Sequence, residues 1–308
     1  MNYVIQFSED VLNEVRVYLT DHSSDSKQIP SGMLYKINGT NISIYKSGKV
    51  LIQGKDADKL YSDLLTLFDV NKNTKKETTT LNPNKSEAQF DLSNITTFPR
   101  IGSDESGKGD FFGPLVTAAF MLISSDVEKK LIELGVTDSK KIKDNKILEL
   151  APIIKRLGPS EVIRINPQKY NELYTKMNNV NKVLGWSHAR AIENVLVKND
   201  CKLAIADKFG DEKLIKNSLF KFGKEVELIQ TPKAERDTAV AAASILAREA
   251  FIKGVKDLSD KYSTSLPLGA GDNVINTGTI YARKNGLESL NQIAKVHFRT
   301  LDNIRNNL

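Results

Sequence analysis

The sequence predicts an α/β protein in which a small α+β domain precedes a larger α/β domain. Two observations support this fold class. From about residue 96 onward, short apolar segments typical of strands alternate with longer amphipathic segments typical of helices. Before residue 70 the order is different: one strand, one helix, several short strands and a closing helix. Residues 71–93, between these parts, are polar and nearly devoid of large aliphatic side chains, which predicts a flexible linker.

The first domain is predicted to cover residues 1–70. YVIQF (3–7) reads as a strand, and Ser8 is placed to cap a following helix. The polar stretch DHSSDSKQIPSG interrupts the pattern. Three short alternating segments, LYKIN, ISIYK and KVLIQG, then read as strands joined by turns, and KDADKLYSDLLTLF closes the domain as an amphipathic helix. The apolar face expected on the first helix consists of Val11, Leu12, Val15 and Leu19.

The second domain is predicted to cover residues 94–308. FPRIGSDE and GPLVTAAFML read as two strands around a glycine-rich turn, and the charged segment 131–150 as a helix in two pieces. EVIRIN, KLAIADKFG and EVELIQ read as further strands. NKVLGWSHARAIENVLVKN and the alanine-rich TAVAAASILAREAFIKGV read as helices, and the first of these has an apolar face that includes His188. Strands that alternate with helices in this way favour a layered α/β domain.

Composition excludes some functions and permits others. The net charge of +6 is compatible with a polyanionic partner but does not establish one. A single cysteine excludes an internal disulfide, and with only three scattered histidines it argues against a structural zinc site. Carboxylates are then the expected metal ligands, which favours Mg²⁺ or Mn²⁺. There is neither a membrane-spanning apolar segment nor a signal-peptide pattern, so we expect a cytoplasmic protein. No feature of the sequence indicates an obligate protein partner, and nothing argues against a monomer, which is the state we expect.

Acidic residues at strand ends are the first candidates for chemistry. Asp104 and Glu105 lie at the end of an apolar strand, and Asp207 ends the apolar strand LAIAD. If these strands are neighbours, the acids converge at one edge of the sheet. Holding such like charges close together is energetically unfavourable unless a cation lies between them or they share protons. Two divalent ions roughly 3.5–4 Å apart could then drive in-line displacement at phosphorus. A single strand-end acid is more often a turn or cap residue, but the adjacent pair favours a site.

The segment GSDESGKG (102–109) is close to the phosphate-binding P-loop pattern, which we reject. The last position is Gly109, so no hydroxyl is available for Mg²⁺, and two carboxylates in the loop would repel phosphates. The segment that follows also reads as a strand and not as a helix. Gly107 and Gly109 would instead let a nucleic-acid backbone approach closely, and a plain turn that requires positive φ is the structural alternative.

Several ordered blocks carry a resemblance to a known family. They are IGSDESGKGDFFGPLVTAA, VTDSKK (136–141), GWSHARAIENVL (185–196), IADKFG (205–210), KAERDTAVAAASILAR (233–248) and KVHFRT (295–300). Together these blocks resemble ribonuclease HIII, a type 2 ribonuclease H, from about residue 97 to the end. The N-terminal unit resembles the TATA-binding-protein-like domain that precedes the catalytic domain in that family.

This resemblance implies a ribonuclease-H-like mixed sheet flanked by helices. It also implies an endoribonuclease that cuts the RNA strand of RNA/DNA hybrids with two Mg²⁺ or Mn²⁺ ions and leaves 5′-phosphate and 3′-hydroxyl ends. The implied metal ligands and catalytic residues are Asp104, Glu105, Asp207 and Glu235. Asp237 is the alternative fourth acid, but it directly precedes an apolar helical segment and is better placed as a helix cap. The backbone of Ser106, Gly107, Lys108 and Gly109 would contact the ribose 2′-hydroxyl, which distinguishes RNA from DNA.

Some alternatives stay open from the sequence. Lys108 stands where the HIII enzymes usually have a small polar residue and the HII enzymes an arginine, so a ribonuclease HII-like enzyme that acts at single embedded ribonucleotides or RNA–DNA junctions is the alternative function. A non-catalytic nucleic-acid-binding protein is the rival from another class. For both His188 and His297 the sequence is compatible with either a histidine packed in the core or a catalytic histidine. A predicted turn in the first domain forms either a hybrid-binding face or an ordinary hairpin, and its residues are Tyr45, Lys46, Ser47 and Lys49.

Overall fold

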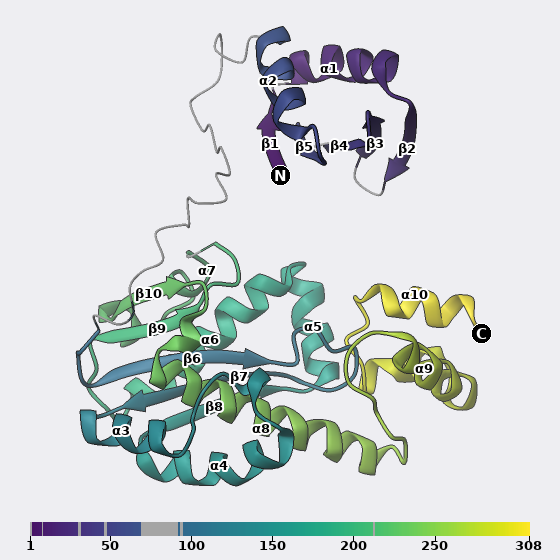
Figure 1. Ribbon diagram of the computed structural model, residues 1–308. Coiled ribbons are helices and arrows are strands. Elements are labelled where there is room, and N and C mark those ends of the chain that lie inside the picture. The colour runs from purple at the N-terminus through teal and green to yellow at the C-terminus, as the bar shows by residue number, and fades with distance from the viewer. Residues whose placement is uncertain are drawn as a thin grey trace. The chain divides into compact units, whose positions relative to one another are not determined.

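The chain forms two compact units, residues 1–88 and 89–308, in a computed structural model (Figure 1). The structure describes residues 2–7, 9–29, 32–45, 48–68, 92, 95–211 and 213–308. Most of the predicted linker, residues 71–93, lies outside these described ranges, as does the predicted cap Ser8.

The N-terminal unit is a five-stranded antiparallel sheet with two helices. Its elements are β1 (Asn2–Gln6), α1 (Glu9–His22), β2 (Asp25–Ile29), β3 (Gly32–Ile37), β4 (Thr40–Tyr45), β5 (Lys49–Gln53) and α2 (Ala57–Leu67), and the strand order is β1-β5-β4-β3-β2. The predicted helix face is confirmed for Leu12, Val15 and Leu19, which are buried, whereas Val11 is only partly buried. They pack against the apolar residues of the strands, among them Ile42 and Ile52.

The sequence missed one strand of this unit. β2 lies in the polar stretch that we expected to be irregular, and it pairs with β3 along its full length. It is an edge strand with almost every residue exposed, so neither face requires apolar side chains and the alternation that reveals a strand is missing.

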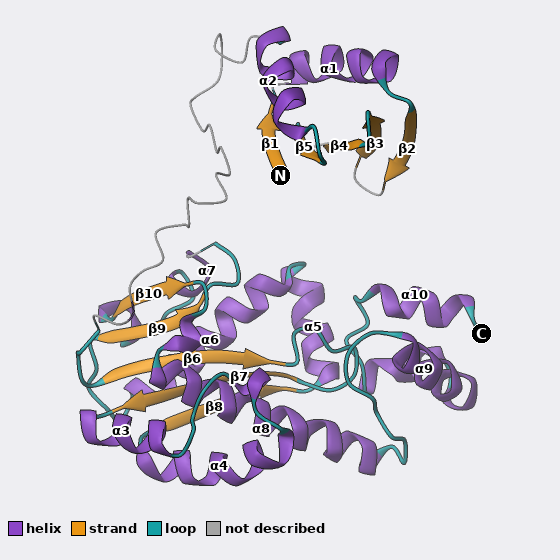
Figure 2. Ribbon diagram, viewed as in Figure 1, coloured by secondary structure: helices purple, strands orange, loops and turns teal. Residues whose placement is uncertain are grey.

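The C-terminal unit is a mixed five-stranded sheet flanked by helices, as predicted (Figure 2). Its strands are β6 (Arg100–Ser106), β7 (Leu115–Leu122), β8 (Ser160–Ile165), β9 (Leu203–Asp207) and β10 (Glu227–Thr231). Its helices are α3 (Ser125–Glu133), α4 (Asp144–Leu157), α5 (Pro167–Met177), α6 (Val180–Leu196), α7 (Lys213–Lys216), α8 (Thr238–Lys261), α9 (Asp272–Asn285) and α10 (Arg299–Asn306), with short 3₁₀ helices that include η2 (Ser139–Lys141) and η4 (Ala234–Arg236).

The sheet has the order β10-β9-β6-β7-β8, so β6 lies between β9 and β7. β6 runs parallel to β9 and antiparallel to β7. β7 is buried along its whole length because helices cover both faces of the sheet. Ala118 and Phe120 face the cluster that contains α4 and α8, while Ala119 and Met121 face the cluster that contains α6.

Gly102 lets the alanine-rich helix α8 approach the sheet closely. A Cβ atom at this position would lie 2.1 Å from the backbone carbon of Ala239 and from the backbone nitrogen of Val240, so only glycine fits. This contact brings the N-terminal end of α8 against β6, two residues before Asp104.

The helical prediction for residues 131–150 was displaced along the chain. α3 ends at Glu133, and α4 runs from Asp144 to Leu157 with Pro152 inside it. α5, α9 and α10 were not predicted, and the buried faces of α9 and α10 rely partly on small or polar residues such as Gly278, Thr279 and Thr300, which conceal the helical period. Within the described ranges, no helix is both long and apolar enough to cross a membrane.

Candidate active site

The predicted convergence of two strand ends is confirmed by the sheet register. Ser103 of β6 pairs with Ala206 of the parallel strand β9, so the next residues along the two strands are Asp104 and Asp207. Both carboxylates therefore leave the sheet at the same edge. Side chains of a strand alternate between its faces, and Gly102 and Ile205 already face α8, so Asp104 and Asp207 extend toward the α8 side.

Asp104 lies in an environment that disfavours its charged form. Burial, followed by the charges of Glu105 and Asp207, raises the pKa of Asp104 to about 8, although its Oδ1 accepts a hydrogen bond from the Glu105 backbone N–H at 2.8 Å. The pKa of Asp207 is also raised, first by burial and then by the charges of Glu235 and Glu105. Asp104, Glu105, Asp207 and Glu235, hereafter the acidic cluster, are thus close enough to act on one another.

The structure distinguishes Glu235 from Asp237. Asp237 is the N-cap of α8, as predicted, because its Oδ1 accepts hydrogen bonds from the backbone N–H groups of Ala239 at 2.8 Å and Val240 at 3.3 Å. Its Oδ2 accepts a hydrogen bond from the buried Arg100 Nε at 2.7 Å. Asp237 therefore already has partners for both carboxylate oxygens, whereas Glu235 is partly exposed in η4 beside Asp207.

Glu105 leaves the strand on the opposite face from Asp104 and contacts α6. Its Oε2 lies 3.2 Å from Nε2 of His188, which is fully buried. The other ring nitrogen, Nδ1, lies 2.7 Å from the hydroxyl of Ser103, and that hydroxyl donates to the carbonyl of Ala118 at 2.9 Å. Ser103 has only one hydroxyl proton, so Nδ1 is the donor in its contact with Ser103. His188 is thus a packed residue that also orients Glu105.

Two lysines lie near the acidic cluster. Lys108 Nζ is 3.8 Å from Glu105 Oε1 and 5.5 Å from the centre of the Phe209 ring, which stacks on His188. Desolvation alone would lower the pKa of Lys140, but the nearby carboxylates, with Asp104 first among them, outweigh it and raise this pKa. The chain therefore places ammonium groups on both sides of the sheet edge at which the carboxylates converge.

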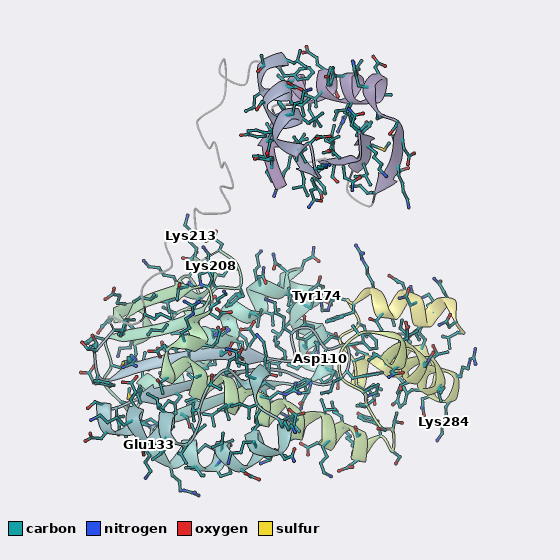
Figure 3. All side chains as sticks on the ribbon, viewed as in Figure 1. Asp110, Glu133, Tyr174, Lys208, Lys213 and Lys284 are labelled. Atoms are coloured by element: carbon teal, nitrogen blue, oxygen red, sulfur yellow. The ribbon has the colours of Figure 1, made fainter. Side chains whose placement is uncertain are left out.

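The two glycines of the 107–109 turn have different roles. Gly107 has φ +87°, and a Cβ there would lie 2.3 Å from the Pro114 carbonyl oxygen, so the turn itself requires glycine. Gly109 faces open space, with no atom within 4 Å of where a Cβ would be. The turn is anchored by Asp110, whose Oδ1 accepts a hydrogen bond from the Gly269 N–H at 2.7 Å. Figure 3 labels Asp110 among the side chains of the C-terminal unit. Ser106 is the last residue of β6.

The acidic cluster is not a preformed metal site. Within the described ranges, no three His, Cys, Asp or Glu side chains are arranged so that they could hold a metal ion. The reason is visible in β6, because Asp104 and Glu105 leave it on opposite faces and Glu105 is held by His188. The donor set itself, four carboxylates with only oxygen atoms, suits Mg²⁺ or Mn²⁺.

The remaining sequence candidates lie elsewhere. In the N-terminal unit, Tyr45 ends β4 and is partly buried, and Lys49 begins β5 and is exposed. Lys46 and Ser47 lie outside the described residues. His297 stacks on Tyr174 with ring centroids 4.1 Å apart, and burial lowers its pKa to about 4, so it is a neutral, packed histidine at pH 7.

Sequence reasoning missed three residues of the site. Ser103 and Phe209 fix His188 from two sides, and Lys140 lies beside Asp104. A signal existed for Lys140, because Asp138 caps a short turn in VTDSKK: its Oδ1 accepts a hydrogen bond from the Lys140 N–H at 3.0 Å. No local pattern distinguishes Ser103 or Phe209 from ordinary core residues.

Comparison with known proteins agrees with this geometry. The family described as Ribonuclease HII matches residues 101–301, and a family described as Domain of unknown function (DUF3378) matches residues 2–79. Ribonuclease HIII of Chlamydia pneumoniae is 38% identical over 311 residues, which cover 98% of this chain and 97% of that protein. Ribonuclease HIII of Protochlamydia amoebophila is 41% identical over 271 residues, which cover 86% and 84% of the two chains.

A solved structure shows the same likeness in three dimensions. The crystal structure of Bst-RNase HIII in complex with Mn²⁺ has a TM-score of 0.65 and 29% sequence identity, and the match covers 100% of this chain and 99% of that one. The similarity to these relatives thus covers both units, including the strands that carry Asp104 and Asp207. The chain belongs to the ribonuclease HIII family.

Proposed function

We propose that this protein is a metal-dependent endoribonuclease that hydrolyses the RNA strand of RNA/DNA hybrids and leaves 5′-phosphate and 3′-hydroxyl ends. One observation carries the proposal. Asp104 lies near the end of β6, and Asp207 ends the adjacent parallel strand β9. The charge of Glu105 raises the pKa of both, and that of Glu235 raises the pKa of Asp207. Partly buried carboxylates in such proximity are unfavourable unless cations or protons compensate them, which makes the cluster suited to divalent ions. The family membership supports the same activity.

Asp104, Glu105, Asp207 and Glu235 would hold two Mg²⁺ or Mn²⁺ ions. When bound, the ions would supply an activated water and charge stabilisation for displacement at the scissile phosphate. Glu105 would have to turn toward the ions from its present 3.2 Å contact with His188 Nε2. In this role His188 is a positioning residue, comparable to the outer partners that orient metal ligands in other sites.

The turn after β6 would bind the ribose next to the scissile bond. The backbone of Ser106, Gly107, Lys108 and Gly109 offers N–H and C=O groups to a 2′-hydroxyl, and the open space at Gly109 permits a sugar to approach. Lys108 Nζ, now 3.8 Å from Glu105, is close enough to contact a substrate phosphate once Glu105 turns away.

The N-terminal unit would contribute a second contact with the hybrid. Its candidate face is the turn with Tyr45, Lys46, Ser47 and Lys49, where an aromatic ring and two ammonium groups are close in sequence. Deletion of residues 1–72 is expected to weaken hybrid binding while the melting of the remaining unit stays cooperative. Unchanged affinity after this truncation would refute the assignment.

The decisive experiment is a cleavage assay on a uniform RNA/DNA hybrid, with Mg²⁺, with Mn²⁺ and with a chelator. We expect metal-dependent cuts in the RNA strand alone. Asp104→Asn should abolish cleavage while hybrid affinity is kept, and Asp200→Asn, a change at an exposed acid that pairs with the exposed Lys202, serves as the matched control. If the purified wild-type chain binds the hybrid without metal-dependent cleavage, it is a binding protein and the proposal fails.

The position of Lys108 favours a second candidate function. A cation in the middle of the turn, as in the HII enzymes, suits recognition of a single embedded ribonucleotide or an RNA–DNA junction. Comparison of cleavage rates on a uniform hybrid and on a DNA duplex with one ribonucleotide decides between the two. Location in the cytoplasm and action as a monomer remain predictions from the sequence.

A further inference from the structure

A cavity of about 550 Å³ adjoins the acidic cluster on the α8 side of the sheet. Its size falls within the range of roughly 300–1,000 Å³ that is common for small-ligand pockets. Glu235, whose charge also acts on Asp207, forms part of its wall. The complete lining is Ile132, Val136, Thr137, Lys141, Lys233, Glu235, Arg236, Thr238 and Ala241.

The two short helices that flank the cavity also serve the acidic cluster. η2 places Lys140 beside Asp104 and the next residue, Lys141, in the cavity wall. η4 places Glu235 beside Asp207, with Lys233 and Arg236 in the wall. A group bound in the cavity would therefore be continuous with a group bound at the carboxylates.

Both helices are fixed to rigid parts of the unit. The Ser139 N–H donates to the hydroxyl of Ser244 on α8 at 3.1 Å, and that hydroxyl also donates to the Ser139 hydroxyl at 2.6 Å. On the other side, the Ala234 N–H donates to Asp207 Oδ1 at 3.2 Å, and the Asp237 N–H donates to the Ala234 carbonyl at 2.9 Å. The cationic residues of the cavity wall are thus carried by segments that are hydrogen-bonded to α8 and β9.

The charge of the wall is strongly unequal. Lys141, Lys233 and Arg236 give three positive charges against the single carboxylate of Glu235, which the metal ions would neutralise. Lys233 has φ 59° and ψ 41°, a left-handed conformation that is uncommon for residues other than glycine, asparagine and aspartate. Such conformations are retained where the surrounding structure or function requires them.

The chemistry of this wall fits one unit of a nucleic-acid strand. Three cations and two threonine hydroxyls suit a phosphate, and the apolar residues Ile132, Val136 and Ala241 suit a sugar. We propose that the cavity binds a backbone phosphate and its sugar from the strand that is cut, next to the scissile phosphodiester. This inference rests on the proposed function, because it assumes that a nucleic-acid strand passes the carboxylates.

The first test removes the cations singly and together. Lys141→Ala, Lys233→Ala and Arg236→Ala change exposed side chains, so folding should be preserved, which thermal melting checks. Each variant is expected to lose about tenfold in affinity for a hybrid, as for other charge-assisted contacts. The slope of log affinity against log salt should fall by about 0.9 for each lost contact with a duplex. Lys129→Ala, an exposed lysine on α3, is the control.

Lys233 permits a sharper comparison. Lys233→Gly removes the ammonium group and also relieves the left-handed backbone, whereas Lys233→Ala removes the charge alone. If the charge binds phosphate, both variants lose the same affinity although Lys233→Gly melts at a higher temperature. If the glycine variant binds as tightly as the wild type, Lys233 has a backbone role and the proposal fails.

The second test places single neutral methylphosphonate linkages at successive positions of the hybrid and measures binding in an Asp104→Asn background. A methylphosphonate at one position of the cut strand, next to the cleavage site, should weaken binding of the hybrid to the Asp104→Asn protein, in which the cavity is unchanged. The same linkage should have no effect on the triple variant, because phosphate and cations then no longer interact. An effect confined to the DNA strand, or an equal effect on both proteins, would overturn the proposal. Absence of cleavage by the wild-type chain would instead overturn the proposed function.

Discussion

Replacement of Asp104 by asparagine should stabilise the metal-free protein. Burial and the neighbouring carboxylates raise the pKa of Asp104 from 3.8 to about 8, so at pH 7 the folded chain holds this group neutral. The unfolded chain would ionise it. The gap between 3.8 and pH 7 is about three pH units, and each is worth about 1.4 kcal/mol, which gives a cost of about 4 kcal/mol at pH 7.

Asparagine is neutral at every pH, and its amide oxygen can still accept the hydrogen bond from the Glu105 N–H. Asp104→Asn should therefore recover most of this cost. For a unit of about 200 residues, 4 kcal/mol corresponds to a rise of roughly 8–16 °C in melting temperature. Asp104 is neutral in the folded state at pH 7, so no charge repulsion is removed by the substitution. The gain arises because asparagine, unlike aspartate, does not have to take up a proton when the chain folds.

The dependence on pH follows from the sign of the change. A carboxyl group whose pKa is raised by folding contributes its stability fully below pH 3.8, and this stability is lost as the pH rises toward about 8. The wild-type protein should therefore lose stability over that range, while Asp104→Asn should lose less. A residual slope is expected in the variant, since the pKa values of Asp207 and Asp237 are also raised, mainly by burial.

The assay is urea or thermal unfolding between pH 4 and pH 8.5, in chelator and again with Mg²⁺ or Mn²⁺. Divalent ions that bind the folded state should stabilise the wild-type protein more than the variant, so the difference between the two should shrink or reverse with metal. Asp200→Asn is the control, because Asp200 is exposed. A variant that melts at or below the wild-type temperature in chelator at pH 7 would refute the reasoning.

Three further predictions concern the surroundings of the cluster. Arg100→Met should destabilise the protein by roughly 3–5 kcal/mol in urea unfolding, since it leaves the buried carboxylate of Asp237 unpaired; a smaller loss than 1 kcal/mol would show that the cap does not need its partner. Gly102→Ala should destabilise far more than Gly271→Ala, because only the first Cβ would meet backbone atoms at 2.1 Å; equal melting temperatures would contradict the close approach of α8. His188→Gln should lower cleavage and raise the metal concentration needed for half-maximal activity, each by about 10–100-fold; a purely structural histidine would leave that metal concentration unchanged.

The sequence alone was sufficient for the parts of the site that depend on local pattern. Acids at or near the end of an apolar strand are visible in RIGSDES and LAIAD, and the apolar character of these segments predicted the strands on which Asp104 and Asp207 lie. The helix cap Asp237 was also readable, because an acidic residue directly before a long apolar-periodic segment has a local function. Membership of the family followed from ordered blocks of residues, which similarity can detect without a structure.

Other features depended on contacts between distant parts of the chain. Asp237 is paired with Arg100, which lies 137 positions earlier, and this contact favours Glu235 over Asp237 as the fourth acid. The edge strand β2 escaped prediction because its only structural requirement is hydrogen bonding to β3. The partner of Glu105 is a histidine 83 residues away whose helical face looks like any packed face.

The sequence by itself determined the chemical groups of this protein: which carboxylates end strands, which glycines form the turn, and which family the chain resembles. Only the tertiary structure decided that His188 holds Glu105 and that a basic cavity, lined in part by Glu235, adjoins the acidic cluster. The physical reason is that hydrophobic period and capping are properties of neighbours along the chain. Electrostatic environment and cavity shape are instead set by residues that meet only after folding.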